Sequence, residues 1–232
     1  MKIHASPRKI GVFLFGIAVL LVVLSVVVNV LHQLGHCEEG IGLMAYKNFN
    51  VNAERNVPTY FSALNLFFAS MLMALCYALN LNREKKSYSW LFLSAVFLFL
   101  SFDEMTEVHE AFAEIMRNAG IGGPGRFFYA VWAIPYLVFG LTVLLIAFKF
   151  LKTLPRYLAR AYIRAGILFV IGAVGFDVFL AFVPNMSIHV IFFTIEEFLE
   201  MSAIIYFIYA TLRYIKLEFK SVKFAFKPGG IE

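Results

Sequence analysis

The sequence predicts an all-α fold, in which six transmembrane helices form one polytopic bundle over residues 1–232. Three observations predict it. Hydrophobic residues make up 61% of the chain, with 27 Phe and a mean hydropathy of +0.79, whereas soluble domains hold about half apolar residues. Several runs also exceed roughly 18 residues without a charge, which is the length that crosses a bilayer. Turn-forming stretches separate these runs. We therefore expect a single integral membrane domain.

Each predicted span is an apolar run bounded by polar or turn-forming residues. The first is too long for a signal peptide and offers no small-residue cleavage site, so we expect it to be retained. The stretch "GIGGPGR" separates the third span from the fourth, and Pro184 with Asn185 predicts a tight hairpin between the fifth and sixth. The six spans are Ile10–Leu31, Val57–Leu81, Tyr88–Arg117, Phe127–Phe148, Arg164–Val183 and Ser187–Leu212.

Basic residues predict the orientation of the bundle. All but four of the 20 Lys and Arg fall before the first span, in the 82–88 and 149–164 segments, or in the tail from Arg213. By the positive-inside rule both termini are cytoplasmic. The net charge of +5 then reflects loops beside anionic lipid rather than nucleic-acid binding. We expect a bacterial inner-membrane protein whose basic tail, residues 213–232, lies on the cytoplasmic surface.

A short acidic motif occurs twice. "SFDEMTE" (101–107) and "TIEEFLE" (194–200) both read [ST]-x-[DE]-E-x-x-E, one in the third span and one in the sixth. Two halves of three spans each would run in opposite directions through the membrane, which is the inverted repeat of many secondary transporters. Chance recurrence of a short acidic motif is the alternative, since the other spans show no similarity between halves.

The acidic residues form stripes at membrane depth. Asp103, Glu107, Glu110 and Glu114 follow one helical face, and the sixth span carries a second acidic face. Buried acids are costly unless they are paired, protonated or bound to metal, and no Lys or Arg is placed to pair with those of the fifth and sixth spans. We therefore expect shared protons or a bound cation. The candidate ligands are Asp103, Glu104, Glu107, His109, Glu110, Asp177, Glu196, Glu197, Glu200, His189, His32 and His36.

Histidines widen the choice of metal. His32 and His36 in "HQLGHCEE" have the i, i+4 spacing of helical metal ligands, and a solvated helix end is the alternative. His189 could equally lie at the membrane interface, and Glu110 with Glu114 could lie above the membrane on an exposed turn. Mixed His and carboxylate ligands suit zinc, iron or manganese, whereas carboxylates alone suit calcium or magnesium. Of the two cysteines, Cys37 lies outside the second span and Cys76 lies inside it, so we expect no disulfide framework.

The segments "FLSFDEMTEVHE", "GAVGFD" and "EEFLEMSAIIYFIYA" together resemble a widespread set of uncharacterised bacterial multi-pass proteins. The shared pattern reads L-S-x-D-E-x-x-x-x-H-E in one helix and E-E-x-x-E-M in the last. The resemblance covers most of residues 90–210 and supplies no activity. It implies that the shared pattern includes Asp103, Glu104, His109, Glu110, Asp177, Glu196, Glu197 and Glu200. Asp177 stands where we would expect Glu.

Two functions fit these features. The first is a cation transporter or exchanger, in which protons and a divalent metal compete for the same carboxylates. Six short helices make a small transporter, and a homodimer is one way to complete it. The second is a membrane-embedded metalloenzyme, either a di-metal oxidoreductase or a lipid hydrolase, although "EVHE" lacks the Glu-x-x-His spacing of di-iron helices. A haem protein and a structural subunit remain as further alternatives. The sequence leaves open whether the loop 34–56 covers the site.

Overall fold

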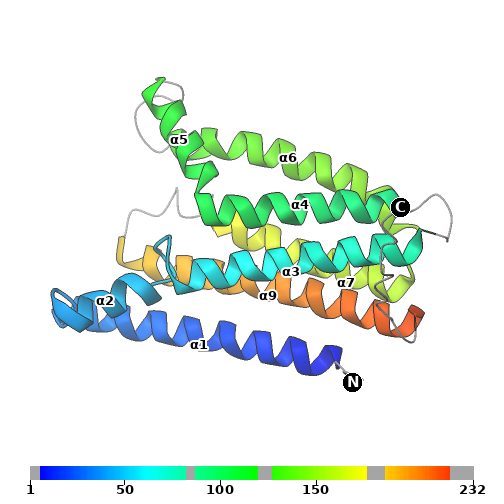
Figure 1. The fold of residues 1–232 in the computed structure, drawn as a ribbon. Coiled ribbons are helices and arrows are strands. Elements are labelled where there is room, and N and C mark those ends of the chain that lie inside the picture. Colours follow the sequence, from blue (N-terminus) through cyan, green and yellow to red (C-terminus); the bar gives the residue numbers. More distant parts are fainter. Residues whose placement is uncertain (1–5, 82–86, 120–126, 177–185, 220–232) are drawn as a thin grey trace, which may run out of the picture.

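Every regular element among the described residues is a helix, as the composition predicts (Figure 1). The computed structural model describes residues 6–81, 87–119, 127–176 and 186–219. Its elements are α1 (Pro7–Gln33), α2 (Gly40–Phe49), α3 (Val57–Asn80), α4 (Ser87–Thr106), α5 (Val108–Asn118), α6 (Phe127–Leu151), α7 (Arg156–Val170), the π-helix η1 (Ile171–Phe176) and α9 (Met186–Phe219).

Three of the described helices are long and apolar enough to cross a membrane. They are α1, α3 and, from Tyr88 onward, α4. The 24 residues of α3 span about 36 Å at about 1.5 Å per residue, more than the ~30 Å hydrocarbon core of a bilayer. Length and composition of the described helices therefore indicate membrane association through at least these three.

Two helix boundaries differ most from the predicted spans, apart from the end of the third. Pro155 precedes the first turn of α7, which begins at Arg156, earlier than the predicted start at Arg164. Because Pro has no N–H and a fixed φ, it suits a helix start. The helix then changes to the π-helix η1 at Ile171. Likewise α9 continues to Phe219, so the predicted tail from residue 213 begins as helix. The predicted hairpin at Pro184 and Asn185 lies outside the described residues.

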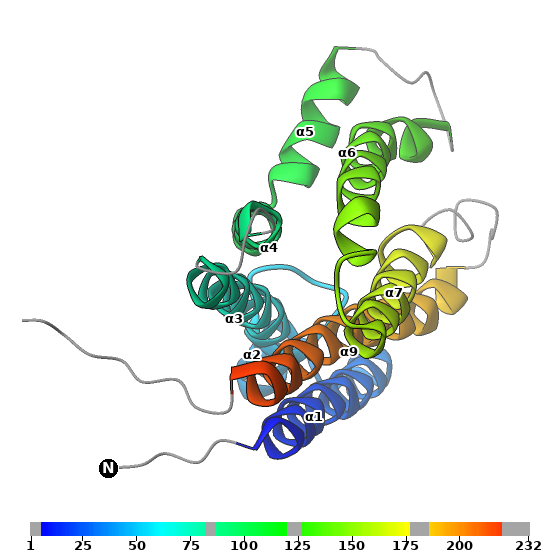
Figure 2. The ribbon, with the colours of Figure 1, turned by 90° about the vertical axis from the view of Figure 1, so that its right-hand side faces the viewer.

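Helix α9 lies at the centre of the bundle, in contact with α1, α3, α7 and η1 (Figure 2). Ala18 of α1 packs against Met201 and Ile205 of α9, and all three side chains are buried. Tyr162 of α7 shares a 2.8 Å hydrogen bond with Thr211 of α9. These contacts hold the acidic stretch of α9 inside the bundle.

Small polar residues join α3 to α4. The Ser70 hydroxyl donates to the Ser94 carbonyl at 2.8 Å, and the Ser94 hydroxyl donates back to the Ser70 carbonyl at 3.0 Å. Ser101 donates to the Ala63 carbonyl at 2.8 Å. Small side chains let two helices approach closely, and such hydrogen bonds are common between transmembrane helices. The α4 segment that carries the acids is therefore fixed against α3.

The predicted loop 34–56 is partly helical, because Gly40–Phe49 forms α2 beside the end of α1. Gly42 packs so closely on the His36 carbonyl that a Cβ at this position would have no room. The His32 ring stacks on Tyr46, with ring centroids 4.1 Å apart. Residues 50–56 then connect α2 to α3. They lie at the end of the bundle where helices α1 and α4 terminate, and we call this end of the bundle the acidic end.

Candidate functional site

The third predicted span breaks at Glu107. We predicted one helix as far as Arg117, but α4 ends at Thr106 and α5 begins at Val108. Glu107 has φ of +54°, in the left-handed region that side chains other than glycine seldom adopt. Its N–H still donates to the Asp103 carbonyl at 2.8 Å. The backbone therefore changes direction at Glu107, and α5 turns away from the axis of α4 (Figure 1).

Glu107 forms a two-pronged ion pair with Arg55. The distances are 2.6 Å from Nε to Oε1 and 2.9 Å from the second guanidinium nitrogen to Oε2. The Arg55 side chain is 71% exposed and that of Glu107 only 13%. Glu107, which we predicted as a cation ligand, thus pairs with an arginine. We had predicted that this arginine, Arg55, lies outside the spans at the edge of the membrane. The stripe from Asp103 through Glu107 to Glu114 does not form, since the helix is interrupted between them.

Both residues of this pair have strained backbones. Arg55 has φ of +57°, and it and Glu107 are the two residues other than glycine with positive φ in the described ranges. Left-handed backbone costs about 1–2 kcal/mol per residue, while an exposed ion pair contributes about 0.2–1 kcal/mol. The pair alone does not offset this strain, so the surrounding structure must hold both residues in place.

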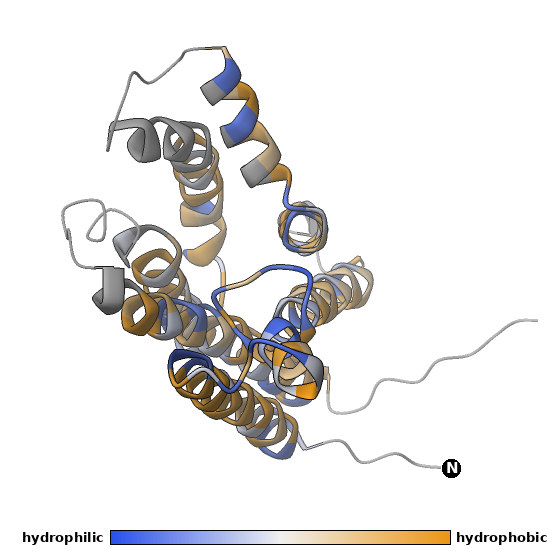
Figure 3. Ribbon diagram, turned by 90° about the vertical axis from the view of Figure 1, so that its left-hand side faces the viewer, coloured by the Kyte–Doolittle hydropathy of each residue, from blue (hydrophilic) through white to orange (hydrophobic). Residues whose placement is uncertain are grey.

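An asparagine network holds the segment before α3. Asn56 is 2% exposed, accepts from the Thr59 N–H as the N-cap of α3, and donates to the Asn50 and Ala53 carbonyls. Asn50 in turn accepts from Asn29 of α1 at 2.9 Å. Such caps and side-chain bonds satisfy backbone groups that a helix leaves open. The loop 50–56, hydrophilic in Figure 3, is therefore anchored at both ends.

Four carboxylates interact electrostatically with Glu197. In decreasing order of influence they are Glu200, Glu104, Glu54 and Glu196. They come from three segments, namely α9, the end of α4 and the loop before α3. Glu196 is 8% exposed, Glu104, Glu197 and Glu200 are half-buried, and Glu54 is exposed. We call these five residues the carboxylate cluster.

Asp103 lies next to Glu104 on α4 and is 7% exposed. Acids from both predicted acidic motifs, Asp103 among them, therefore lie at the acidic end of the bundle. Of the predicted ligands, the structure thus brings together Glu104, Glu196, Glu197 and Glu200.

The π-helix η1 packs directly on this part of α9. A Cβ added to Gly172 would lie 2.9 Å from Cγ of Glu200 and 3.2 Å from the carbonyl oxygen of Glu196. Only glycine fits at this separation without displacing one of them. Short π-helical segments inside α-helices occur often at functional sites. The backbone of η1 at Gly172 therefore lies close to the Glu200 side chain.

The predicted His32 and His36 pair does not share a helical face. Helix α1 ends at Gln33, because Gly35 adopts φ of +78°, and His36 lies in the turn that follows. Both histidines are exposed. The i, i+4 spacing therefore does not place the two histidines on a common helical face.

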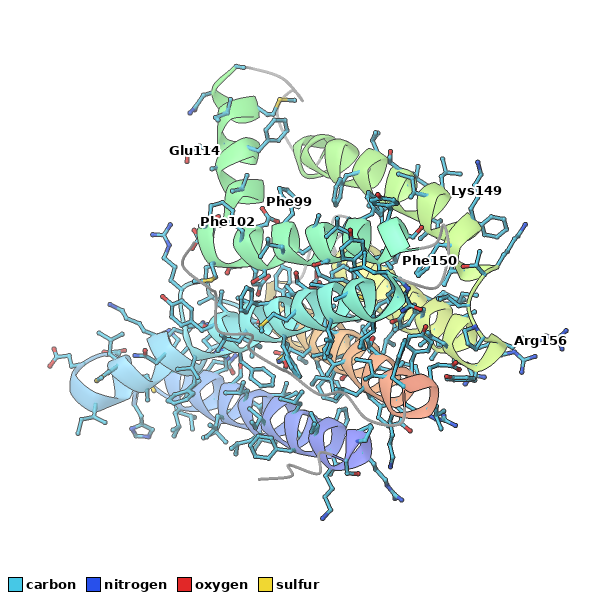
Figure 4. The ribbon with its side chains drawn as sticks, turned by 45° about the vertical axis from the view of Figure 1, so that its right-hand side comes forward. Phe99, Phe102, Glu114, Lys149, Phe150 and Arg156 are labelled. Carbon is cyan, nitrogen blue, oxygen red and sulfur yellow. The ribbon has the colours of Figure 1, made fainter. Side chains whose placement is uncertain are left out.

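The remaining candidates are only partly described. Asp177 lies outside the described residues, and for His109, Glu110 and His189 the structure describes the backbone alone. Glu114 is exposed on α5 (Figure 4). Within the described part of the chain, no three His, Cys, Asp or Glu side chains form a group that could hold a metal ion in this arrangement.

Sequence reasoning missed three residues of the site: Glu54, Arg55 and Gly172. Glu54 and Arg55 precede α3 and lie at the acidic end of the bundle, where α4 also terminates. Their position just before a membrane-length helix was the available signal. Gly172, in "GAVGFD", carried no signal beyond its residue type, because the contact with Glu200 depends on how η1 meets α9.

The fold and the site define an all-helical protein with membrane-length helices and a cluster of acids where α3, α4 and α9 meet. The chain belongs to the family described as "Domain of unknown function (DUF8692)", whose sequence model matches residues 44–215. The match includes every residue of the carboxylate cluster and excludes His32 and His36. No curated protein and no solved structure matches the chain.

Proposed function

We propose that this protein is a cation transporter or exchanger in which the carboxylate cluster binds a divalent cation in competition with protons. The observation that carries the proposal is the electrostatic coupling of Glu197 to four other carboxylates from three segments of the bundle. Like charges repel, and uptake of protons or of a cation would reduce the negative charge of the cluster. Oxygen ligands of this kind suit calcium or magnesium, and a nearby histidine would extend the choice to zinc, iron or manganese.

The proposal includes six spans with both termini in the cytoplasm of a bacterial inner membrane. In support, α1 begins, α6 ends, α7 begins and α9 ends at one end of the bundle, opposite the acidic end (Figures 1 and 4). Basic residues of that end include Arg8, Lys149, Lys152, Arg156 and Arg213. An excess of Lys and Arg on one side is the usual mark of the cytoplasmic face.

An inverted 3+3 repeat is part of the same proposal. In support, α4 and α9 run in opposite directions in the bundle (Figure 1), and each carries one copy of the acidic motif. The copies differ locally, since the first ends at the break after Thr106, whereas the second lies within the continuous helix α9. Binding at the interface of two such halves is the arrangement typical of secondary transporters. We expect a homodimer, and expect the carboxylates to move closer together around a bound ion.

Flux through proteoliposomes tests the proposal. We expect protein-dependent uptake of one divalent cation from zinc, manganese, iron and calcium, together with proton movement in the opposite direction. Glu197→Gln with Glu200→Gln should abolish both fluxes, while Glu114→Gln, an exposed acid on α5, should leave them intact. Uptake that is equal in the double variant would contradict the proposal. So would tight metal binding without movement of any ion, which would instead fit an enzyme.

A further inference from the structure

We propose that the Arg55–Glu107 ion pair is a gate on the carboxylate cluster, closed in this structure and opened when the pair separates. The inference rests on the proposed function, in that it concerns access of a cation to this cluster. It gives a role to Arg55 and to the strained turn at Glu107. Cation binding by the cluster alone requires neither of them.

The pair joins the two segments that carry cluster acids from outside α9. Arg55 follows Glu54 directly, and Glu107 comes one helical turn after Glu104. Both Glu54 and Glu104 interact with Glu197. The salt bridge therefore closes the loop before α3 onto the end of α4, beside the place where these acids face α9.

The two side chains of the pair differ in exposure, and the more exposed one, Arg55, faces water, as expected for a gate that opens to water. The Glu107 side chain is 13% exposed, whereas the Arg55 side chain is 71% exposed. Water can therefore solvate the guanidinium as soon as it leaves Glu107. Anchors at Asn50 and Asn56 confine the movement to the short stretch between them.

Backbone strain makes the closed state easy to leave. Arg55 and Glu107 both have left-handed backbones, at φ of +57° and +54°, and strain of this kind is often found at elements with two states. The ion pair offsets only part of this strain, so the contact between Arg55 and Glu107 holds the closed state weakly. In the closed state the Arg55 guanidinium also supplies positive charge beside Glu54. A cation bound in the cluster would supply positive charge to the same carboxylate. Loading of the cluster should therefore favour release of Arg55.

Thiol labelling tests the gate without measuring transport. In a variant with Cys37 and Cys76 replaced by Ala, Glu104→Cys is introduced and the protein is placed in lipid nanodiscs, which expose both faces to a water-soluble maleimide. Breaking the pair with Arg55→Ala or Glu107→Gln should increase the labelling rate, up to about fivefold, the factor expected for an exposed ion pair. The charge-swapped variant Arg55→Glu with Glu107→Arg should restore the slow rate.

Met105→Cys provides the matched control. Met105 adjoins Glu104 and is already 51% exposed, so its labelling should not change with the pair. A labelling rate at position 104 that is the same with and without the pair would overturn the proposal. A swap that labels as fast as the single variants, at an unchanged melting temperature, would do so as well. Arg55→Lys, which keeps one contact, should give an intermediate rate even if a swapped variant folds poorly.

The outcome separates the gate from the proposed function. If labelling responds as expected and proteoliposomes move no cation, the gate stands and the transport proposal fails. If cation flux occurs and labelling ignores Arg55→Ala, the gate alone fails.

Discussion

Gly172 decides how closely η1 can approach the carboxylate cluster. Its missing side chain leaves room for Glu200, whose Cγ would lie 2.9 Å from a Cβ at this position. Contact this short cannot be accommodated without moving the acidic side chain or the π-helix. The residue therefore links the packing of α7 and η1 to the position of a proposed cation ligand.

We predict that Gly172→Ala destabilises the protein by about 1–3 kcal/mol, the usual cost of overpacking a close contact. Gly175→Ala is the matched control in the same π-helix, since the nearest atom to its Cβ would be Cγ2 of Ile171 at 3.9 Å. Thermal denaturation in detergent measures both. Equal melting temperatures for the two variants would show that η1 does not press on Glu200.

Asn56 supports both the start of helix α3 and the position of the loop 50–56. The buried amide caps the helix through the Thr59 N–H and also binds the carbonyls of Asn50 and Ala53. Loss of the Asn56 side chain would therefore affect both the first turn of α3 and the segment that carries Glu54 and Arg55.

We predict that Asn56→Ala costs about 1–2 kcal/mol for the cap alone, with faster hydrogen exchange over residues 50–60. Asn48→Ala is the control, because the Asn48 amide makes only a local 2.8 Å bond to Met44 in α2. Hydrogen exchange followed by mass spectrometry resolves the two regions. Unchanged exchange in the Asn56 variant would mean that other contacts anchor this loop.

At the level of helices, the sequence predicted some boundaries well and missed one break. The second span was predicted as Val57–Leu81 and forms Val57–Asn80, since its apolar run is bounded by polar residues on both sides. The break at Glu107 had no such signal, because "MTEVHE" contains neither Gly nor Pro. The left-handed turn accompanies a partner 52 positions earlier in the chain, Arg55, and contacts at that separation leave no local pattern.

At the scale of the whole molecule, the distribution of charge suggests an orientation. Acids gather where α4 ends, and Arg and Lys gather where α6 ends and α7 begins (Figure 4). The sequence predicted this separation from loop composition, and it also predicted that the acidic motifs of the third and sixth spans meet. It could not predict that Glu54 joins them, because the path of the loop 50–56 depends on tertiary contacts with α1.

We predict that a cysteine in place of Glu114 is labelled by an impermeant maleimide in intact cells, while a cysteine in place of Lys152 is labelled only after permeabilisation. Both are introduced after Cys37 and Cys76, which are buried, have been replaced by Ala. The proposed topology, which follows the positive-inside rule, predicts that Lys152 lies on the cytoplasmic side. Labelling of both positions in intact cells would exclude this topology.

The central claim is that the carboxylate cluster binds a divalent cation, and metal-dependent thermal stability of the purified protein tests it most directly. At a metal concentration about 100 times the dissociation constant, binding should stabilise the wild type by about 2.7 kcal/mol, or roughly 5–10 °C for a domain of this size. Glu114→Gln should respond like the wild type, and Glu197→Gln with Glu200→Gln should lose the response. An unchanged melting temperature of the wild type with zinc, manganese, iron and calcium would contradict the account, as would an equal shift in the double variant.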